Sequence, residues 1–440
     1  MRKIVIFVTV ALAMLVYPVA ATVINVPDDY VMIQSALDSG TAGDTVLVQP
    51  GTYFENINFN GNDIVLGSMY LITEDTSFIS ATIIDGQVIE WASVITFSGG
   101  ENNDAMVIGF TIANGFNSNG GGISCTNNSN PTISHNVITD NTGLGGGGGI
   151  YCHYSDPIIT RNIIKSNWAP GAEVGFGGGI YCENANPTIS FNLITGNSAG
   201  SGEFSGGYGG GIFCDISSPN IVNNTIVANS ASSWAGGIFC ATTSAPIIVN
   251  SIVRGNIAPY EPELEFDDSS TPTIIYCDIT GIWYGDGNID CDPMFCDSDS
   301  GNYYLSTISC CVDAGEEGVD IGAYGVGCDT ELLYEYLPGD VNMFNGEWPP
   351  QVIGGDVTYL VNFFRAAPSS QPCFLDGFWC SADANGDCLV IGSDVTRLVN
   401  YLRGQALISF CRDYPSAWPT PDDLPDVMPS EWPNCNTETP

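Results

Sequence analysis

The stretch GGGIYCENANPTISFNLITGN, Gly177–Asn197, is one of several similar units in this chain of 440 residues. The other copies are GGGISCTNNSNPTISHNVITDN (120–141), GGGIYCHYSDPIITRNIIKSN (147–167), GGGIFCDISSPNIVNNTIVAN (209–229) and AGGIFCATTSAPIIVNSIVRGN (235–256). Each copy holds one cysteine, namely Cys125, Cys152, Cys182, Cys214 and Cys240. The insertions APGAEVGF and GSGEFSGGY fall at one point of the unit, which predicts loops on one face of a repeat architecture.

Within a unit, apolar residues alternate over short runs that Gly, Asn and Pro interrupt. Ile180 and Cys182 form one such run, and Ile189 and Ile194 belong to the next two. Runs this short with a period of two predict brief β-strands rather than helices. A single unit cannot bury its apolar face, so successive units must stack as rungs about 4.8 Å apart. We therefore predict a mainly β fold, a parallel β-helix.

Asparagines and cysteines recur at fixed points of the unit. Asn tolerates left-handed backbone and can stack its amide from rung to rung, which we expect at Asn136, Asn162, Asn192 and Asn224. The alternation that points Ile180 inward also predicts a file of the five repeat cysteines along the core. We favour buried thiols, because parallel Cβ vectors suit a disulfide poorly, and disulfides between adjacent rungs are the alternative. Cys277 aligns with the asparagine bend instead.

Both ends of the repeat region differ from its middle. The segment before the first strands predicts a short amphipathic helix at Val31–Leu37, which would cap the open end of the coil. At the other end, a segment rich in Cys and Asp breaks the period and predicts a closing cap. We expect disulfides among some of its cysteines, which are Cys291, Cys296, Cys310, Cys311 and Cys328.

The charge and the first residues limit the partners and the location. With 49 Asp and Glu against 9 Lys and Arg, the net charge is −40, which excludes nucleic acids and anionic membranes as favourable partners. Residues 1–21 hold a basic start, an apolar run and small residues, which predict a signal peptide for bacterial-type export. A secreted, extracellular location permits disulfides.

The opening VPDDYVMIQSALDSGTAGDTVLVQPGTY (26–53), the NPTIS-x-N-x-I-x-x-N units and the closing DIGAYG (320–325) resemble the right-handed parallel β-helix family, which includes pectate-lyase-like proteins. The resemblance covers residues 22–329. It implies a right-handed solenoid, and for the relatives with known chemistry it implies polysaccharide lyase, glycoside hydrolase or epimerase activity in a groove along an outer sheet.

Such activities need particular residues. A lyase needs a strong base beside acids that bind calcium, and only Arg161, Lys165 and Arg254 are basic between residues 22 and 329. We expect the first two to face outward on one rung and Arg254 to align with Lys165 three rungs later, about 14 Å away. A hydrolase needs two acids about 5 to 9.5 Å apart, for which the candidates are Asp140, Asp156, Glu183 and Asp215.

The two histidines and the outward aromatic residues admit a simpler interpretation. His135 and His153 lie at different points of different rungs, and we interpret them as solvated surface residues rather than bases. Exposed aromatic side chains at Tyr151, Tyr181 and Phe213 could stack on sugar rings. We favour stacking between rungs, which stabilises the sheet.

From Pro338 the composition changes and two similar segments appear. In ADANGDCLVIGSDVTRLVNYLRGQ (382–405), acidic and amide residues fall at positions 1, 3, 5 and 12 of a loop before an amphipathic helix. This spacing predicts a Ca²⁺ site, with a main-chain carbonyl at position 7. The alternative is an Asp-rich turn that caps the helix. The predicted ligands are Asp383, Asn385, Asp387, Leu389 and Asp394.

The paired segments resemble the type I dockerin family, a small α-helical, EF-hand-like calcium module that docks onto cohesin modules. Two features differ from that family: Cys388 replaces the usual Gly, and the first segment, GDVNMFNGEWPPQVIGGDVTYLVNFFRAAP (339–368), has five extra residues. Its candidate ligands are Asp340, Asn342 and Asp356, with Asn345 or Glu347 recruited from the insertion. Candidate disulfide cysteines are Cys373, Cys380, Cys388 and Cys411.

The sequence thus predicts a signal peptide (1–21), a β-helix (22–329), a linker (330–337), a dockerin-like module (338–412) and an extended tail rich in Pro and acids (413–440). The expected function is a secreted structural or carbohydrate-binding rod whose calcium-dependent module attaches it to a cohesin-type partner. The alternative is a polysaccharide lyase or glycoside hydrolase. A third view makes the module a self-folding stabiliser.

Overall fold

The computed structural model describes residues 21–200, 206–281 and 283–329. The predicted signal peptide up to residue 20, the linker, the dockerin-like module with its calcium ligands and the tail lie outside these residues. The chain divides into two compact units. The first holds the residues up to Cys277 together with Tyr284–Asn288, and the second holds Asp278–Trp283 and the residues from Ile289 onward.

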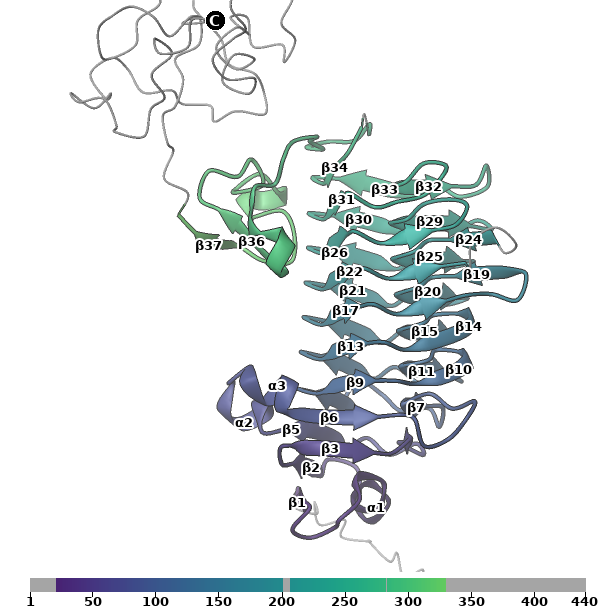
Figure 1. Ribbon diagram of the computed structural model, residues 1–440, viewed down its shortest axis with the longest axis vertical. Coiled ribbons are helices and arrows are strands. Elements are labelled where there is room, and N and C mark those ends of the chain that lie inside the picture. The colour runs from purple at the N-terminus through teal and green to yellow at the C-terminus, as the bar shows by residue number, and fades with distance from the viewer. Residues whose placement is uncertain (1–20, 201–205, 282, 330–440) are drawn as a thin grey trace, which may run out of the picture. The chain divides into compact units, whose positions relative to one another are not determined.

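The first unit is a coil of parallel strands (Figure 1), as the repeats predict. From β2 onward, the complete rungs pass through sheets A, B and C in turn, and consecutive rungs pair in register. Sheet A contains β1 (Val23–Val26), β2 (Thr45–Val48), β5 (Val65–Ser68), β8 (Met106–Ile108), β12 (Thr132–Ser134), β16 (Ile158–Thr160), β21 (Thr188–Ser190), β26 (Asn220–Val222), β30 (Ile247–Val249) and β33 (Thr273–Ile275).

Sheets B and C complete the rungs. Sheet B contains β3 (Gly51–Phe54), β6 (Thr82–Asp85), β9 (Thr111–Ala113), β13 (Val137–Thr139), β17 (Ile163–Lys165), β22 (Leu193–Thr195), β27 (Thr225–Val227) and β31 (Ile252–Arg254). Sheet C contains β4 (Ile57–Asn58), β7 (Ile95–Phe97), β11 (Ile123–Thr126), β15 (Ile150–His153), β20 (Ile180–Glu183), β25 (Ile212–Asp215), β29 (Ile238–Ala241) and β32 (Leu264–Phe266).

A fourth sheet, sheet D, lies between sheets B and C along the chain in the later rungs. It contains β10 (Phe116–Asn119), β14 (Thr142–Gly146), β18 (Trp168–Ala169), β19 (Val174–Phe176), β23 (Ser198–Ala199), β24 (Gly206–Tyr208) and β28 (Ser230–Ala231). The strands β19 and β24 come from the two sequence insertions, so these insertions form paired strands rather than irregular loops.

The glycine run that begins each unit has a steric cause. Gly177 has a φ of +59°, which favours glycine, and a Cβ there would collide with the carbonyl oxygen of Ile180. A Cβ on Gly179 would lie 2.6 Å from the carbonyl oxygen of Gly211 on the next rung. The run therefore lets neighbouring rungs approach closely just before each strand of sheet C.

The predicted asparagine stack is confirmed. Asn162 Nδ2 donates to Asn192 Oδ1 at 3.1 Å, and Asn192 Nδ2 donates to Asn224 Oδ1 at 3.0 Å. The predicted left-handed backbone is wrong, because the positive φ falls on the residue before each asparagine, for example 55° at Arg161 and 55° at Phe191. The turn residue points outward and leaves the next residue free to aim its amide into the coil.

A second asparagine stack, which we did not predict, follows sheet B. Its members are buried, and each donates its amide to the next at 2.9 to 3.0 Å. They are the last residues of the five repeated units, Asn141, Asn167, Asn197, Asn229 and Asn256. Two internal amide stacks therefore link the rungs in addition to the strand hydrogen bonds.

The repeat cysteines form the predicted file. They pair in register along sheet C, are buried, and are thiols rather than disulfides: Cys125, Cys152, Cys182, Cys214 and Cys240. Burial raises the pKa of the Cys125 thiol. Cys277 lies at the asparagine bend as predicted, where its thiol contacts the carbonyl oxygen of Ile275 at 3.2 Å. Asn224 donates to the corresponding carbonyl oxygen of Val222.

The predicted helix at the start of the coil is present as α1 (Ile33–Ser39), two residues later than expected. The Glu55 carboxylate accepts hydrogen bonds from the main-chain N–H groups of Ile33 and Gln34 at 2.8 and 2.9 Å, which fixes where the helix begins. Its buried face holds Ile33, Ala36 and Leu37. Two further helices, α2 (Tyr70–Thr73) and α3 (Ser77–Ala81), follow β5.

The second unit holds β34 (Asp278–Ile279), β35 (Phe295–Asp297), η1 (Ser298–Ser300), β36 (Asn302–Ser306), η2 (Glu316–Gly318) and β37 (Val326–Cys328). Disulfides join Cys291 to Cys310 and Cys296 to Cys328, which confirms that some of these cysteines are bridged. Its role as a closing cap stays a prediction. In the part of the chain that the structure describes, no helix has the length and apolarity needed to span a membrane.

Candidate functional site

The outer surface of sheet C carries two files of side chains. Because alternate residues of a strand point the same way, the residues on either side of each inward cysteine face outward. The first file is aromatic, with Tyr151, Tyr181 and Phe213 in register. The second file, which we call the acidic file, holds His153, Glu183 and Asp215 on three consecutive rungs.

The aromatic file is covered, so the expectation of exposed rings is wrong. Tyr151, Tyr181 and Phe213 are 7, 7 and 4% exposed. Phe176 of β19 and Tyr208 of β24 pack against them, and the ring centroids of Phe176 and Phe213 lie 4.7 Å apart. The predicted ring contacts between rungs are confirmed: the rings of Tyr181 and Phe213 meet edge to face at 5.3 Å, and those of Phe213 and Phe239 stack at 5.6 Å.

The acidic file brings two of the four candidate acids together. Glu183 and Asp215 are direct register partners on adjacent strands, so their Cα atoms lie about 4.8 Å apart. The Tyr151 hydroxyl donates a hydrogen bond to Glu183. Burial, and then this hydrogen bond, raise the pKa of Tyr151, so the phenol stays protonated and remains a donor. His153 lies beside Glu183 on the preceding rung and is half-buried rather than solvated.

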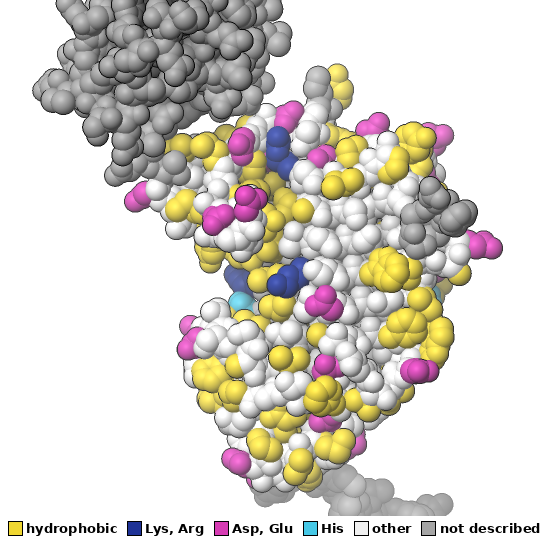
Figure 2. Space-filling model, viewed as in Figure 1, with side chains coloured by type: hydrophobic (Ala, Val, Ile, Leu, Met, Phe, Trp, Pro, Cys, Tyr) yellow, Lys and Arg dark blue, Asp and Glu magenta, His cyan; other side chains and the backbone are white. Residues whose placement is uncertain are grey.

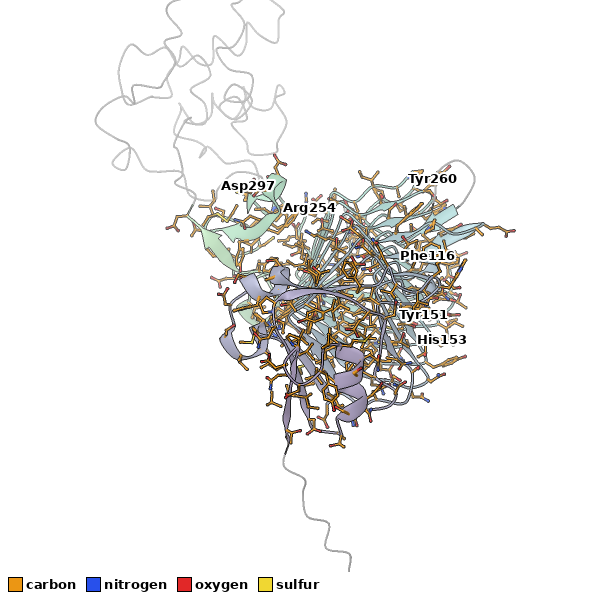
Figure 3. The ribbon with its side chains drawn as sticks, turned by 60° about the horizontal axis from the view of Figure 1, so that its bottom comes forward. Phe116, Tyr151, His153, Arg254, Tyr260 and Asp297 are labelled. Carbon is orange, nitrogen blue, oxygen red and sulfur yellow. A yellow bond between two sulfur atoms is a disulfide. The ribbon has the colours of Figure 1, made fainter. Side chains whose placement is uncertain are left out.

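Exposed aromatic side chains lie around this surface. Tyr154 is 55% exposed, and its ring centroid lies 4.3 Å from that of His153. On sheet D and its continuation, Trp168 is 44% exposed, and Tyr260, 57% exposed, stacks on Trp234 at 4.7 Å. Figure 3 shows Tyr151, His153 and Tyr260 on one side of the coil, and Figure 2 shows hydrophobic side chains gathered over the sheet D strands.

A basic corner lies at the bend between sheets A and B. His135, Arg161 and Phe191 occupy this bend on consecutive rungs, and the Arg161 guanidinium lies 5.0 Å from the centroid of the Phe191 ring. The Tyr70 ring centroid lies 5.2 Å from that of His135. Burial and the charge of Arg161 lower the pKa of His135. His135 is thus half-buried in a contact cluster, which corrects the expectation of a solvated residue.

The other candidate residues lie apart from these groups. Lys165 is exposed on the rung of Arg161, and Arg254 is its register partner three rungs later, as predicted. Asp140 is exposed and accepts a hydrogen bond from the Thr139 hydroxyl at 2.8 Å. Asp156 is exposed and accepts one from the main-chain N–H of Asn186 at 2.5 Å.

A coil whose rungs stack into parallel sheets defines the class of parallel β-helix proteins. The chain belongs to the family described as "Right handed beta helix region", whose model matches residues 45–202 and 175–292, more than half of the chain. None of the curated proteins is similar to it in sequence. Among solved structures, "Crystal structure of pectate lyase Pel9A" is similar, with 14% identity and a TM-score of 0.37 over 67% of this chain and 91% of that chain.

Proposed function

We propose that the coil is a carbohydrate-binding rod of a secreted protein and that the acidic file, with the exposed aromatic residues around it, binds the glycan. The observation that carries this proposal is the register of His153, Glu183 and Asp215 beside the exposed ring of Tyr154. Carboxylates accept hydrogen bonds from sugar hydroxyls, and an exposed ring packs against the apolar face of a sugar. Because the net charge of −40 repels polyanions, the ligand class is a neutral polysaccharide.

Affinity electrophoresis in gels that contain neutral polysaccharides tests this proposal. We expect at least one such glycan to retard the protein, and we expect the double variant Glu183→Gln, Asp215→Asn and the variant Tyr154→Ala to lose about tenfold in affinity, because one lost charged hydrogen bond or ring contact contributes about 1 to 2 kcal/mol. The matched control is Asp140→Asn, which changes an exposed acid outside the file. Retardation that these variants leave unchanged would contradict the assignment.

We further propose that the dockerin-like module binds Ca²⁺ and attaches the secreted protein to a cohesin-type partner. The spacing of Asp383, Asn385, Asp387 and Asp394 supports this proposal. Isothermal titration of the full chain with Ca²⁺ should show binding that Asp387→Asn weakens, whereas Asp422→Asn in the tail should leave it unchanged. A cohesin pull-down with and without chelator then tests the attachment. Calcium binding without any cohesin contact would favour the self-folding stabiliser.

A glycoside hydrolase is the second candidate, and the register pairing of Glu183 with Asp215 on adjacent rungs favours it. Retaining hydrolases place their two carboxyl groups about 5 to 5.5 Å apart, which is close to the spacing of in-register rungs. Glu183→Gln should then abolish the release of reducing ends from a bound glycan. If the protein binds a glycan and releases no new ends, it is a binding protein. A lyase would instead release unsaturated ends that Arg161→Gln or Lys165→Gln abolishes.

A further inference from the structure

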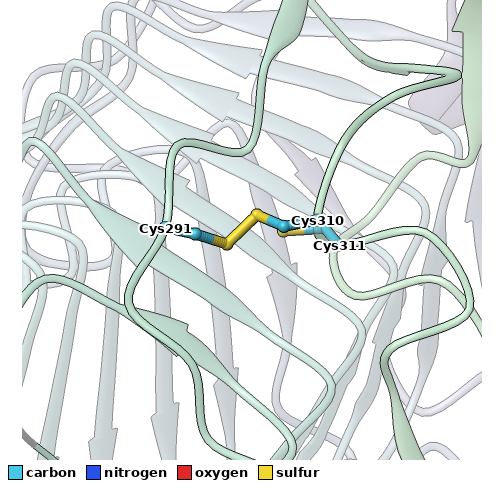
Figure 4. Close-up of side chains that lie close together, drawn as sticks. All are labelled: Cys291, Cys310 and Cys311. Atoms are coloured by element: carbon cyan, nitrogen blue, oxygen red, sulfur yellow. A yellow bond between two sulfur atoms is a disulfide. The ribbon is translucent and has the colours of Figure 1, made fainter. Parts of the chain in front are cut away.

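Three cysteines of the second unit lie together, and a disulfide joins two of them. Cys291 and Cys310 form a disulfide, and Cys311 keeps its thiol (Figure 4). The sulfur atoms of all three lie within 4.8 Å of one another. Cys291 and Cys311 are buried, whereas Cys310 is exposed. A thiol beside a disulfide is the arrangement from which thiol–disulfide exchange proceeds.

A buried carboxylate joins the two sides of this cluster. Asp278 is fully buried, and its Oδ1 accepts a hydrogen bond from the main-chain N–H of Cys291 at 3.1 Å. Its Oδ2 lies 3.7 Å from the Cys311 sulfur, within reach of the thiol proton. The carboxylate can therefore accept the proton that Cys311 must lose before its sulfur becomes a nucleophile.

We propose that Cys311 exchanges with Cys310 for the bond to Cys291, so that the protein exists as two disulfide isomers. The Cys311 thiolate attacks the Cys291 sulfur, the Cys291–Cys310 bond breaks, and a Cys291–Cys311 bond forms. Cys310 leaves as a thiolate and takes up a proton from water, while Asp278 holds the proton released by Cys311. One disulfide replaces another, so the step needs neither an oxidant nor a reductant.

The exchange moves the thiol from a buried position to an exposed one. In the first isomer the thiol is Cys311, which solvent reagents do not reach. In the second isomer it is Cys310, which is exposed and open to covalent modification. The cluster is thus a modification site for thiol-reactive molecules, and attack on Cys291 is favoured over attack on Cys310, because a bond between neighbouring cysteines is geometrically strained.

Alkylation of the full chain without reductant tests the exchange. The folded protein is incubated with iodoacetamide, then unfolded, treated with a second alkylating reagent of different mass, digested and mapped by mass spectrometry. We expect the first label to accumulate on Cys310 together with a Cys291–Cys311 disulfide. The rate should rise by up to about tenfold per pH unit below the thiol pKa, because the thiolate is the nucleophile. A first label absent from Cys310 would overturn the proposal.

Two single variants provide an independent readout. Cys310→Ser should still form a disulfide, now between Cys291 and Cys311, and Cys311→Ser should hold Cys291–Cys310 and stop the labelling. The Cys296–Cys328 disulfide is the internal control and should stay unlabelled in every sample. Cys291 and Cys311 recovered as thiols from Cys310→Ser, with Cys296–Cys328 intact, would contradict the proposed second isomer.

Discussion

At the scale of single residues, the coil is held together by amides that point inward. Asn192 donates to the carbonyl oxygens of Ile159 and Ser190 and to the side chain of Asn224, and it accepts from Asn162. A buried amide stabilises the stack when its N–H and C=O groups all form hydrogen bonds. If one amide of the stack is missing, the amides on the neighbouring rungs lose a hydrogen-bond partner. The stack therefore needs an amide on each rung at this point.

Asn192→Ala should lower the free energy of unfolding by about 3 kcal/mol, because it leaves several buried polar groups without partners. Chemical denaturation followed by circular dichroism measures this change. Asn220→Ala is the matched control, because Asn220 is exposed on β26, and we expect a change below about 0.5 kcal/mol there. Equal effects at the two sites would contradict a structural role for the stack.

A second prediction at the scale of single residues concerns the pKa of His135 in the basic corner. Burial and the charge of Arg161 lower the pKa of His135, so Arg161→Gln should raise that pKa toward the ordinary value of about 6.5. An NMR titration of the His135 ring measures it, with Lys165→Gln as the control that should leave it unchanged. If Arg161→Gln leaves the pKa of His135 unchanged, the charge of Arg161 does not act on His135 as we infer.

The lowered pKa of His135 also sets the sign of its effect on stability. The unfolded chain binds the proton more readily, so neutral His135 contributes stability that is present above the ordinary pKa. That contribution is lost as the pH falls through the pKa of the folded protein. Because Arg161→Gln narrows the difference between the two pKa values, it should reduce this loss of stability in acid.

At the scale of elements, the inserted strands decide what the outer face of sheet C exposes. The alternation along the sequence predicts correctly that Tyr151, Tyr181 and Phe213 point outward and stack. It does not reveal that Phe176 and Tyr208 lie over them, because the insertions contain many glycines and have no strong period of their own. Phe176 contacts Tyr181 and Phe213, which come later in the chain, so the contact forms only when the coil itself has formed. The local sequence pattern does not encode such a contact.

Phe213→Ala should therefore cost about 3 to 5 kcal/mol in the free energy of unfolding, as expected for a buried aromatic residue. An exposed ring on the solvent face of a sheet would cost far less. Tyr284→Ala is the control, because Tyr284 is 93% exposed and its removal should cost below about 0.5 kcal/mol. Urea denaturation of both variants measures the difference, and a small loss at Phe213 would mean that the inserted strands do not cover it.

At the scale of the whole molecule, the repeat spacing was sufficient to predict the stacked rungs, the cysteine file and the asparagine stack. These features depend on the regular spacing of the repeated units, and that spacing can be seen in a single sequence. The pairing of Glu183 with Asp215 follows from the same register and could have been found by aligning the residues after each repeat cysteine. The contact that half-buries His135 against Tyr70 could not be predicted in this way, because Tyr70 belongs to α2, which lies outside the repeat.

The cysteine pattern predicts how many thiols the described residues contain, and chemical labelling can count them. After unfolding without reductant, the peptides from the described residues should yield seven thiols, from Cys125, Cys152, Cys182, Cys214, Cys240, Cys277 and one member of the Cys291, Cys310 and Cys311 cluster. The same reagent should not reach the first six in the folded protein, because they are buried. A disulfide between Cys152 and Cys182 would contradict the thiol file.

Distances between pairs of spin labels along sheet B test the in-register stacking of rungs most directly. Lys165 and Thr195 are partners on adjacent rungs, and Arg254 is three rungs from Lys165, about 14 Å away. With cysteines placed at these positions and labelled, dipolar broadening beyond that of the singly labelled samples should be strong for the pair 165 and 195 and much weaker for the pair 165 and 254. Equal broadening in the two pairs, or none in the first, would contradict the stacked coil.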